Sequence, residues 1–323
     1  MNNKPKVLIV ADRAGWAIDR LTKPVAEICD NVEMSYFSVS DNRYLDTGYS
    51  KRGGVLYNPL MANKYDVVHY HRVPASYNHL DKVTARKIVT LHTERIEDFK
   101  DYDLDKYDDI ICLTRYMVDE VAKLVEKANV HYCPVGIDLE RYKFAWKQPD
   151  DKIIGYCGRV LYHKRFATIK KAVFDAGLRL NGCGYINDPL EFDAYNDIIK
   201  EGRDFNYVIF LPEPQMVDFY SKMNLFVCLS EPHIEAGPLP VLEAMACGIP
   251  VISTRVGWAV DHCTDHGNIW FVDEGNIDEL KDTILNVYND RGIRRRLRDN
   301  GLRLIKEFSL DNYVKNLNKI YEN

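Results

Sequence analysis

Short apolar runs alternate with amphipathic segments along most of the chain, a pattern typical of a parallel β-sheet covered by helices. Helical spacing is visible in AIDRLTKPVAEIC (17–29) and is clearest in RYMVDEVAKLVEKA (115–128). The first half is therefore predicted to form one α/β domain. Its buried strands are predicted from KVLIVA (6–11), VEMSYFSV (32–39), DVVHYH (66–71), KIVTLH (87–92), DIICLT (109–114) and VHYCP (130–134).

The alternation resumes after a polar, proline-containing segment, ERYKFAWKQPDD (140–151), and we place a domain boundary there. The predicted domains are residues 1–145 and 146–308, followed by an amphipathic segment at 309–323. The 323 residues exceed what one core usually supports, and the 46% hydrophobic content can fill two cores. Strands of the second domain are predicted from KIIGYCG (152–158), YVIFL (207–211), LFVCLS (225–230), PVIST (250–254) and IWFV (269–272).

Composition narrows the class of protein. No apolar run approaches the roughly 20 residues needed to cross a bilayer, and the first segment turns polar too early for a secretory signal, so we expect a cytoplasmic protein. Eight scattered cysteines without a CxxC pair indicate neither a disulfide framework nor a zinc site. With 43 Lys and Arg against 48 Asp and Glu, the chain lacks a broadly basic character.

The segment EPHIEAGPLPVLEAMACGIPVIST (231–254) constrains the function most tightly. Seven residues separate Glu235 from Glu243, and they form a Gly- and Pro-rich turn that opens a short helix ending at Gly248. The N–H groups in the first turn of a helix are unpaired and favour an anion, so a phosphate can dock between the two acids. The alternative is an acid placed early in a helix for its dipole, with a second acid on a surface loop.

A second cluster lies upstream, in IIGYCGRVLYHKRFATIKKA (153–172). The predicted strand ends at Gly158, Arg159 follows at once, and Lys164 is predicted to start the next helix. Arg grips phosphate oxygens in a bidentate fork and Lys adds a point charge, so the two together can neutralise a diphosphate. Taken alone, both are also compatible with ordinary solvated charges.

Together these segments resemble the retaining glycosyltransferases of family 4, which have the GT-B fold of two Rossmann-like α/β domains facing across a cleft. The resemblance covers most of the chain. It rests on Gly158-Arg159 with Lys164 five residues after the arginine, and on the Glu-x7-Glu pair continued by EAMACGIPVIST. Weaker matches are YDVVHYH (65–71), IVTLHTE (88–94), IICLTRYMVDEV (110–121) and PVGID (134–138).

The resemblance implies a metal-independent hexosyltransferase without a cofactor, which uses a nucleotide-diphosphate sugar bound mainly by the second domain. It implies that Glu243 binds the ribose diol, that Arg159 and Lys164 bind the diphosphate, and that Glu235 acts on the hexose near the anomeric carbon. Retention would follow a same-face route in which the leaving phosphate helps take the acceptor proton. The donor site would be completed by Gly158, Gly237, Pro238 and Leu239.

The acceptor is expected mainly on the first domain, with the segment 309–323 packing back on it. There His92 is the candidate catalytic histidine, ahead of the histidines at 69, 71, 163 and 233. Thr93 follows it, and Gly15 with Trp16 follows the first strand. The chain departs from the family in its short loop at Gly15 and in having Gly237-Pro238 where many relatives have aromatic-Gly. Neither the donor base, sought around LPEPQM (211–216), nor the acceptor is therefore fixed.

Other interpretations stay open beside a glycan, lipid-linked or small-molecule acceptor. The loop 41–60 interleaves cations with tyrosines and would suit a modified DNA base as acceptor. A nucleotide-sugar 2-epimerase, another GT-B enzyme, would use a similar donor pocket, and the alternative of another class is a catalytically inactive nucleotide-sugar-binding regulatory subunit. DYDLD (101–105) looks like a metal motif of a different glycosyltransferase fold but is interpreted as solvated surface. RGIRRRLR (291–298) is either a peripheral contact with anionic lipid or a solvated helix face.

Overall fold

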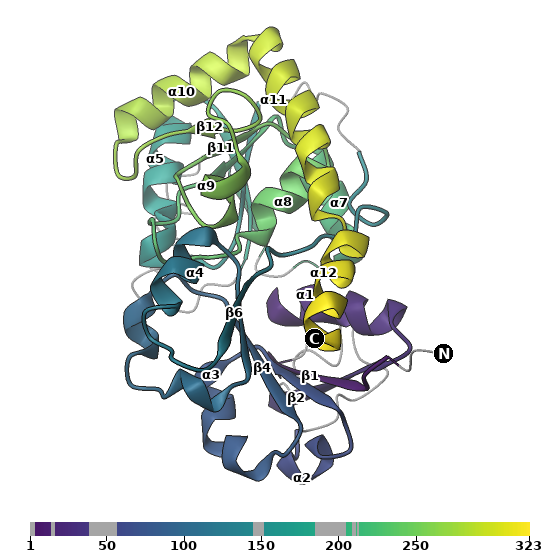
Figure 1. Cartoon of the computed structure of the whole chain (residues 1–323). Helices are drawn as coiled ribbons and strands as arrows, with labels where there is room; N and C mark the ends of the chain where they lie inside the picture. Colours follow the sequence, from purple (N-terminus) through teal and green to yellow (C-terminus); the bar gives the residue numbers. More distant parts are fainter. Residues whose placement is uncertain are drawn as a thin grey trace. The chain divides into compact units, whose positions relative to one another are not determined.

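The structure is a computed structural model of the whole chain, and it describes residues 4–13, 17–38, 57–144, 152–184, 205–208, 211 and 213–323. The chain divides into two compact units. The first consists of Met1–Asp138 with Phe308–Asn323, and the second of Leu139–Glu307. The first unit therefore ends before residue 145, and the chain returns to it for the final helix (Figure 1).

The first unit contains a six-stranded parallel sheet in the order β2-β1-β3-β4-β5-β6. The inner strands β1, β3, β4 and β5 coincide with apolar runs of the sequence, because strands covered on both faces need side chains that can be buried on both, whereas the edge strand β6 is exposed to half-buried. Its strands are β1 (Val7–Arg13), β2 (Val32–Ser38), β3 (Val67–Tyr70), β4 (Arg86–Leu91), β5 (Asp109–Cys112) and β6 (Asn129–Tyr132).

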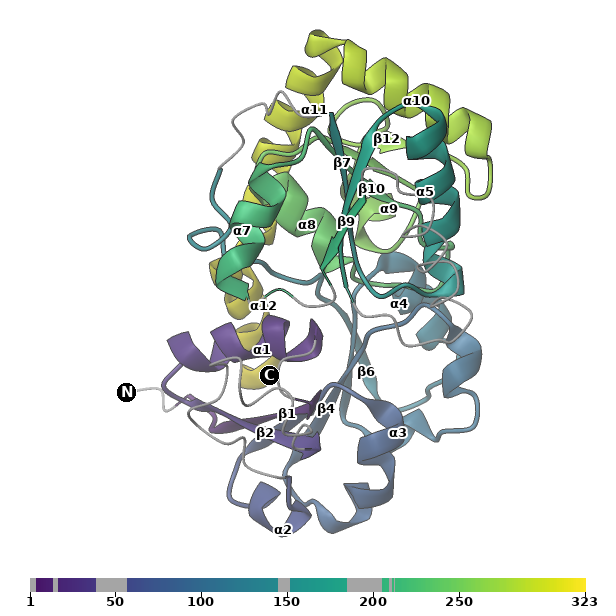
Figure 2. The ribbon, with the colours of Figure 1, turned by 180° about the vertical axis from the view of Figure 1, so that it is seen from behind.

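Helices cover both faces of this sheet. One face carries α1 (Ala17–Ile28) and α12 (Leu310–Glu322), and the other carries α3 (Val73–Ser76) and α4 (Arg115–Val121) (Figures 1 and 2). The remaining elements of the unit are short: α2 (Pro59–Ala62), η2 (Tyr77–Lys82), η3 (Ile96–Phe99) and η4 (Leu104–Lys106).

Helix α4 is shorter than the predicted segment 115–128. The carboxylate of Asp105 accepts hydrogen bonds from the backbone N–H groups of Glu126, Lys127 and Ala128, at 2.8–3.1 Å. Those N–H groups are consequently held in a turn and cannot continue the helix. Asp105 belongs to DYDLD, so this part of the segment interpreted as solvated surface fixes a neighbouring loop.

Helix α12 is anchored on the first unit by its start and by its end. Near its start, Ile137 N–H donates to Phe308 O at 2.8 Å and Leu310 N–H donates to Ile137 O at 2.9 Å. Near its end, Tyr321 Oη lies 2.8 Å from His69 Nδ1 on β3. The close packing also needs Gly136, because a Cβ there would lie 2.4 Å from Tyr313 Cβ.

The second unit contains another six-stranded parallel sheet, in the order β12-β11-β10-β7-β8-β9. Strand β8 was not predicted, because its sequence RLNGC has no apolar run. Strand β9 begins at Phe205, before the predicted run 207–211. The strands are β7 (Ile153–Cys157), β8 (Arg179–Cys183), β9 (Phe205–Val208), β10 (Leu225–Cys228), β11 (Val251–Ser253) and β12 (Trp270–Phe271).

On this sheet, α5 (Phe166–Asp175) and α10 (Ile277–Asn289) lie on one face, and α7 (Glu213–Ser221), α8 (Leu239–Ala246) and α11 (Arg291–Leu304) lie on the other (Figures 1 and 2). Short elements are η5 (Tyr162–Lys164), α9 (Trp258–His262) and η6 (Ile305–Phe308). The core between sheet and helices includes Ile154, Leu225, Ile169 and Ile284. Among the described helices, none has the length and apolar character to cross a bilayer.

Candidate functional site

Two loops of the second unit bring an acid and two bases together. They follow β7 and β10, which pair directly, so both loops leave the same edge of the sheet. Lys164 Nζ forms an ion pair with Glu235 Oε1, and His163 Nε2 lies 3.4 Å from the same oxygen. Burial raises the pKa of Glu235, but Lys164 and His163 outweigh this effect and lower the pKa to about 2. Glu235 is therefore a fixed anion at neutral pH.

The loop after β7 corrects one prediction. Lys164 does not start a helix: it ends η5, and α5 begins at Phe166. Between them Arg165 has φ 50° and ψ 36°, a left-handed conformation that interrupts the helical path. Gly158 lies beside the lysine, because a Cβ at 158 would be 3.4 Å from Lys164 Cδ.

The two predicted cations have different surroundings. Lys164 is mostly buried, with 15% of its side chain exposed, and is paired with Glu235. The Arg159 side chain is exposed and makes no ion pair with any residue that the structure describes. Its backbone is fixed, since Arg159 O accepts a hydrogen bond from Tyr156 Oη at 2.7 Å. Arg159 thus has a fixed backbone carbonyl and an exposed side chain.

Helix α8 has the position and the boundaries that its sequence indicates. Pro238 is its N-cap, Leu239 is its first residue, and Glu243 lies one turn inside. The first turn closes through Val241 N–H to Pro238 O at 3.0 Å. At the other end Gly248 has φ 80°, the left-handed conformation of a C-terminal glycine. The start of α8 therefore follows Glu235 within one short turn, in which Gly237 is half-buried.

Glu243 is buried, with 3% exposure, and both of its oxygens accept hydrogen bonds within the second unit. Tyr142 Oη donates to Oε1 at 3.1 Å and Tyr220 Oη donates to Oε2 at 2.7 Å. Each carboxylate oxygen can accept a second hydrogen bond, so the two phenols fix the orientation of Glu243 without using all of its acceptor capacity. Neither tyrosine belongs to a motif, and the sequence contained no signal that could have identified them.

Gly257 fixes the loop that carries Glu235. It has φ 54°, and a Cβ there would lie 2.5 Å from Ala236 O and 2.7 Å from Glu235 O. The adjacent Trp258 N–H donates to Ala236 O at 3.1 Å. The loop after β11 therefore packs directly on the backbone of Glu235, and any side chain at position 257 would separate them. The sequence analysis did not identify this glycine.

In the first unit the structure joins histidines that the sequence left as competing candidates. His71 and His92 follow the neighbouring strands β3 and β4, and His71 Nδ1 lies 2.9 Å from His92 Nε2. The ring of His69 is 4.3 Å from that of His71, and its Nε2 lies 2.7 Å from Thr90 Oγ1. Burial lowers the pKa of His92 to about 4, so the ring is neutral at pH 7.

The structure says less about the other residues that were predicted for the acceptor side. Thr93 Oγ1 accepts a hydrogen bond from Arg95 N–H at 3.1 Å, so this hydroxyl stabilises a turn. Gly15 and Trp16 lie outside the described residues, as do most of the loop 41–60 and parts of 211–216. Within the described part of the chain, no group of three or more His, Cys, Asp or Glu side chains could hold a metal ion.

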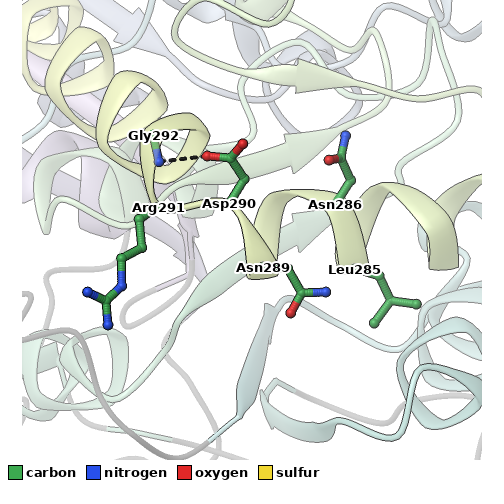
Figure 3. Close-up of a pocket in the computed structure, with 6 residues that line it drawn as sticks. All are labelled: Leu285, Asn286, Asn289, Asp290, Arg291 and Gly292. Atoms are coloured by element: carbon green, nitrogen blue, oxygen red, sulfur yellow. Dashed lines mark hydrogen bonds between the residues drawn. The ribbon is translucent and has the colours of Figure 1, made fainter.

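A shallow surface hollow lies elsewhere, between the end of α10 and the start of α11 (Figure 3). Asp290 Oδ1 accepts hydrogen bonds there from Gly292 N–H at 2.7 Å and from Ile293 N–H at 3.0 Å, so a carboxylate already caps α11. No predicted site residue lines this hollow, and we assign it no role. Its lining is Leu285, Asn286, Asn289, Asp290, Arg291 and Gly292.

Comparisons with known proteins agree with these observations. The profile of the family described as glycosyl transferases group 1 matches residues 138–303. An uncharacterized glycosyltransferase of Methanocaldococcus jannaschii is 26% identical over 255 residues, which cover 75% of this chain and 70% of that protein. The capsular polysaccharide biosynthesis glycosyltransferase CapM of Staphylococcus aureus is 25% identical over 201 residues, covering 58% of this chain and 52% of CapM.

Solved structures show the same fold at low sequence identity. Anabaena HepE in complex with UDP and glucose has a TM-score of 0.81 at 14% identity, covering 98% of this chain and 99% of HepE. Sucrose-phosphate synthase from Thermosynechococcus elongatus has a TM-score of 0.78 at 16% identity, covering 98% of each chain. The predicted fold class, two Rossmann-like α/β domains of the GT-B kind, is confirmed. Because the family profile spans 166 of the 323 residues, this chain belongs to the glycosyl transferases group 1 family.

Proposed function

We propose that this protein is a retaining glycosyltransferase of family 4 that transfers a hexose or related sugar from a nucleotide-diphosphate sugar. The observation that carries the proposal is the Lys164–Glu235 pair just before the start of α8. An ammonium has three N–H donors, so Lys164 can keep its bond to Glu235 and still bind a phosphate oxygen. The UDP and glucose bound by the structural neighbour HepE support a donor of this class.

The other predicted donor-site residues would each bind a different part of the nucleotide sugar. The exposed side chain of Arg159 suits a bidentate grip on the diphosphate, next to the close-packed backbone at Gly158. Glu243, oriented by the phenols of Tyr142 and Tyr220, would bind the ribose diol with its remaining acceptor capacity. The residues that lead into α8 would contribute backbone contacts, and they are Gly237, Pro238 and Leu239.

The acceptor side would lie on the first unit around His92. A neutral imidazole can donate or accept a hydrogen bond at an acceptor hydroxyl, with His71 holding its Nε2. We assign Gly15, Trp16 and Thr93 to the same side. The relative CapM acts in capsular polysaccharide biosynthesis, which favours a glycan or a lipid-linked glycan over a modified DNA base.

A donor panel tests the proposal directly. We expect purified protein, supplied with a panel of glycan, lipid-linked and small-molecule acceptors, to consume one class among UDP-, GDP- and ADP-sugars, releasing the nucleoside diphosphate and forming a glycosylated acceptor that mass spectrometry detects. A chain that binds one of these donors without consuming it would be the inactive regulatory subunit. Conversion of the sugar to its 2-epimer would identify an epimerase instead.

The mechanism makes a further prediction about metal and stereochemistry. Lys164, Arg159 and the first turn of α8 supply positive potential for the leaving diphosphate, so transfer should continue in excess EDTA. On a same-face route the product should keep the donor's anomeric configuration, which proton NMR of the new linkage reports. Activity that is abolished by the chelator and restored by manganese, or an inverted anomer, would refute this mechanism.

A further inference from the structure

Arg165 occupies a backbone conformation that ordinarily favours glycine. Its φ of 50° and ψ of 36° place it in the left-handed region, at the N-cap of α5. Its side chain makes no capping hydrogen bond to the helix. A glycine would adopt this conformation without strain, and Ser, Thr, Asp or Asn would supply a cap. The arginine provides neither advantage, so its role must lie in what its guanidinium contacts.

The guanidinium of Arg165 joins the two loops that form the donor site. Its Nη2 pairs with Glu231 Oε1 in the loop after β10, and its centre lies 4.7 Å from the ring centroid of Tyr162. The backbone makes a second link, because Glu231 N–H donates to His163 O at 2.8 Å. Both side chains of the ion pair are largely buried, with 23% and 21% exposed.

These links run beside the functional pair. Lys164 directly precedes Arg165, and Glu235 follows Glu231 in the same loop. We propose that Arg165 is a positioning residue, whose ion pair with Glu231 holds the loop after β7 against the loop after β10, so that Lys164 faces the leaving diphosphate beside Glu235. This inference rests on the proposed function. It adds two residues that belong neither to the Glu-x7-Glu pair nor to the Gly-Arg…Lys segment.

Replacing Arg165 by glycine distinguishes a positioning role from a structural role. A positioning role affects ligand affinity and turnover, whereas a structural role also affects thermal stability. Arg165→Gly relieves the strain but leaves the largely buried Glu231 unpaired, whereas the double variant Arg165→Gly/Glu231→Gln also removes that charge, so the melting temperature of the double variant should stay at or above the parent's value. In Arg165→Gly the affinity for the nucleoside diphosphate and kcat/KM should nevertheless fall by about 10-fold, because the lysine is no longer fixed. Glu231→Gln should cause a similar loss, and the double variant should be no worse than either single variant.

The experiment combines calorimetry with UDP, GDP and ADP, thermal unfolding and donor turnover. Arg165→Lys serves as the conservative rescue, because it keeps the charge for Glu231 and should recover part of the affinity. Lys171→Gln is the matched control, since its pair with Asp175 lies on the exposed side of α5. We expect this control to match the parent in all three measurements.

The outcomes separate this inference from the proposed function. If the parent binds none of the three diphosphates, the proposed function fails and the inference falls with it. If the parent binds one of them, and Arg165→Gly and Glu231→Gln bind and turn over within twofold of the parent, only the positioning role is overturned. A melting temperature that falls together with the affinity in the double variant Arg165→Gly/Glu231→Gln would make Arg165 a structural residue and would also overturn the inference.

Discussion

Replacing Lys164 by alanine is expected to lower kcat/KM for sugar transfer by about 100-fold or more, because it removes the cation that the structure places beside Glu235. Truncating one partner of a largely buried charge pair costs about 2–5 kcal/mol, since the other charge is left without compensation. Steady-state kinetics on the donor that the parent consumes gives the value. Lys171→Ala is the control, as its exposed pair with Asp175 lies on the same helix that follows the loop.

A second variant separates loss of chemistry from loss of folding. In Lys164→Ala the one ion-pair partner of Glu235 left among the described residues is His163, at 3.4 Å, so the melting temperature should fall as well. Adding Glu235→Gln removes the buried charge, and the double variant should regain stability without regaining transfer. A folded Lys164→Ala enzyme with kcat/KM within threefold of the parent would show that the diphosphate binds elsewhere.

Strands were predictable where burial on both faces demands an apolar run. This holds for the inner strands β1, β3, β4 and β5 of the first unit and fails for β8, which is mostly buried although its RLNGC sequence is short and partly polar. The length of α4 was not predictable: directly after Val121 the N–H groups of Lys123 and Leu124 bond to Glu120 O and Val121 O in tight turns, and farther on Asp105, a side chain from a different loop, takes up the N–H groups of residues 126–128. Local periodicity carries no information about such a contact.

In the candidate site too, features marked by local sequence could be predicted and those set by contacts between distant residues could not. The turn from Glu235 into α8 could be predicted because Pro238, Pro240 and Gly248 mark both helix ends locally. The partners of Glu243 could not, since Tyr142 and Tyr220 come from distant parts of the chain and have no distinctive spacing. The left-handed conformation of Arg165 could not be predicted for a related reason: its contact with Glu231 depends on the pairing of β7 with β10.

The contact between histidines of the first unit depends on the order of strands in the sheet, which the sequence alone does not reveal. His71 and His92 each looked like an isolated residue at the end of a strand, and the adjacency of β3 with β4 brings them into hydrogen-bond distance. Burial lowers the pKa of His69 to about 3 and that of His92 to about 4, and it lowers the pKa of His71 well below the usual 6.5. All three rings are therefore neutral in the folded protein at pH 7.

Acidification is consequently expected to destabilise the first unit between about pH 6.5 and pH 4. In the unfolded chain these histidines take up protons near pH 6.5, whereas in the folded chain they resist protonation until near pH 4 or below. Stability is thus independent of these groups above pH 6.5 and falls as the pH decreases through the window. For His92 alone, the free energy of unfolding should be about 2 kcal/mol lower at pH 5 than above pH 6.5, because each pH unit below 6.5 costs about 1.4 kcal/mol.

Hydrogen exchange followed by mass spectrometry can resolve this effect by unit. Between pH 7 and pH 5, after correction for intrinsic rates, peptides from β3 and β4 should lose protection, while peptides from β10 and β11 should lose less. The reason is that Glu235, with its pKa lowered to about 2, becomes a source of acid sensitivity only below its usual 4.5. His92→Gln should flatten the dependence in the first unit, and His266→Gln, exposed on the second unit, should leave it unchanged. Equal loss of protection in both units, or none above pH 5, would mean that the buried histidines do not control the acid stability of this fold.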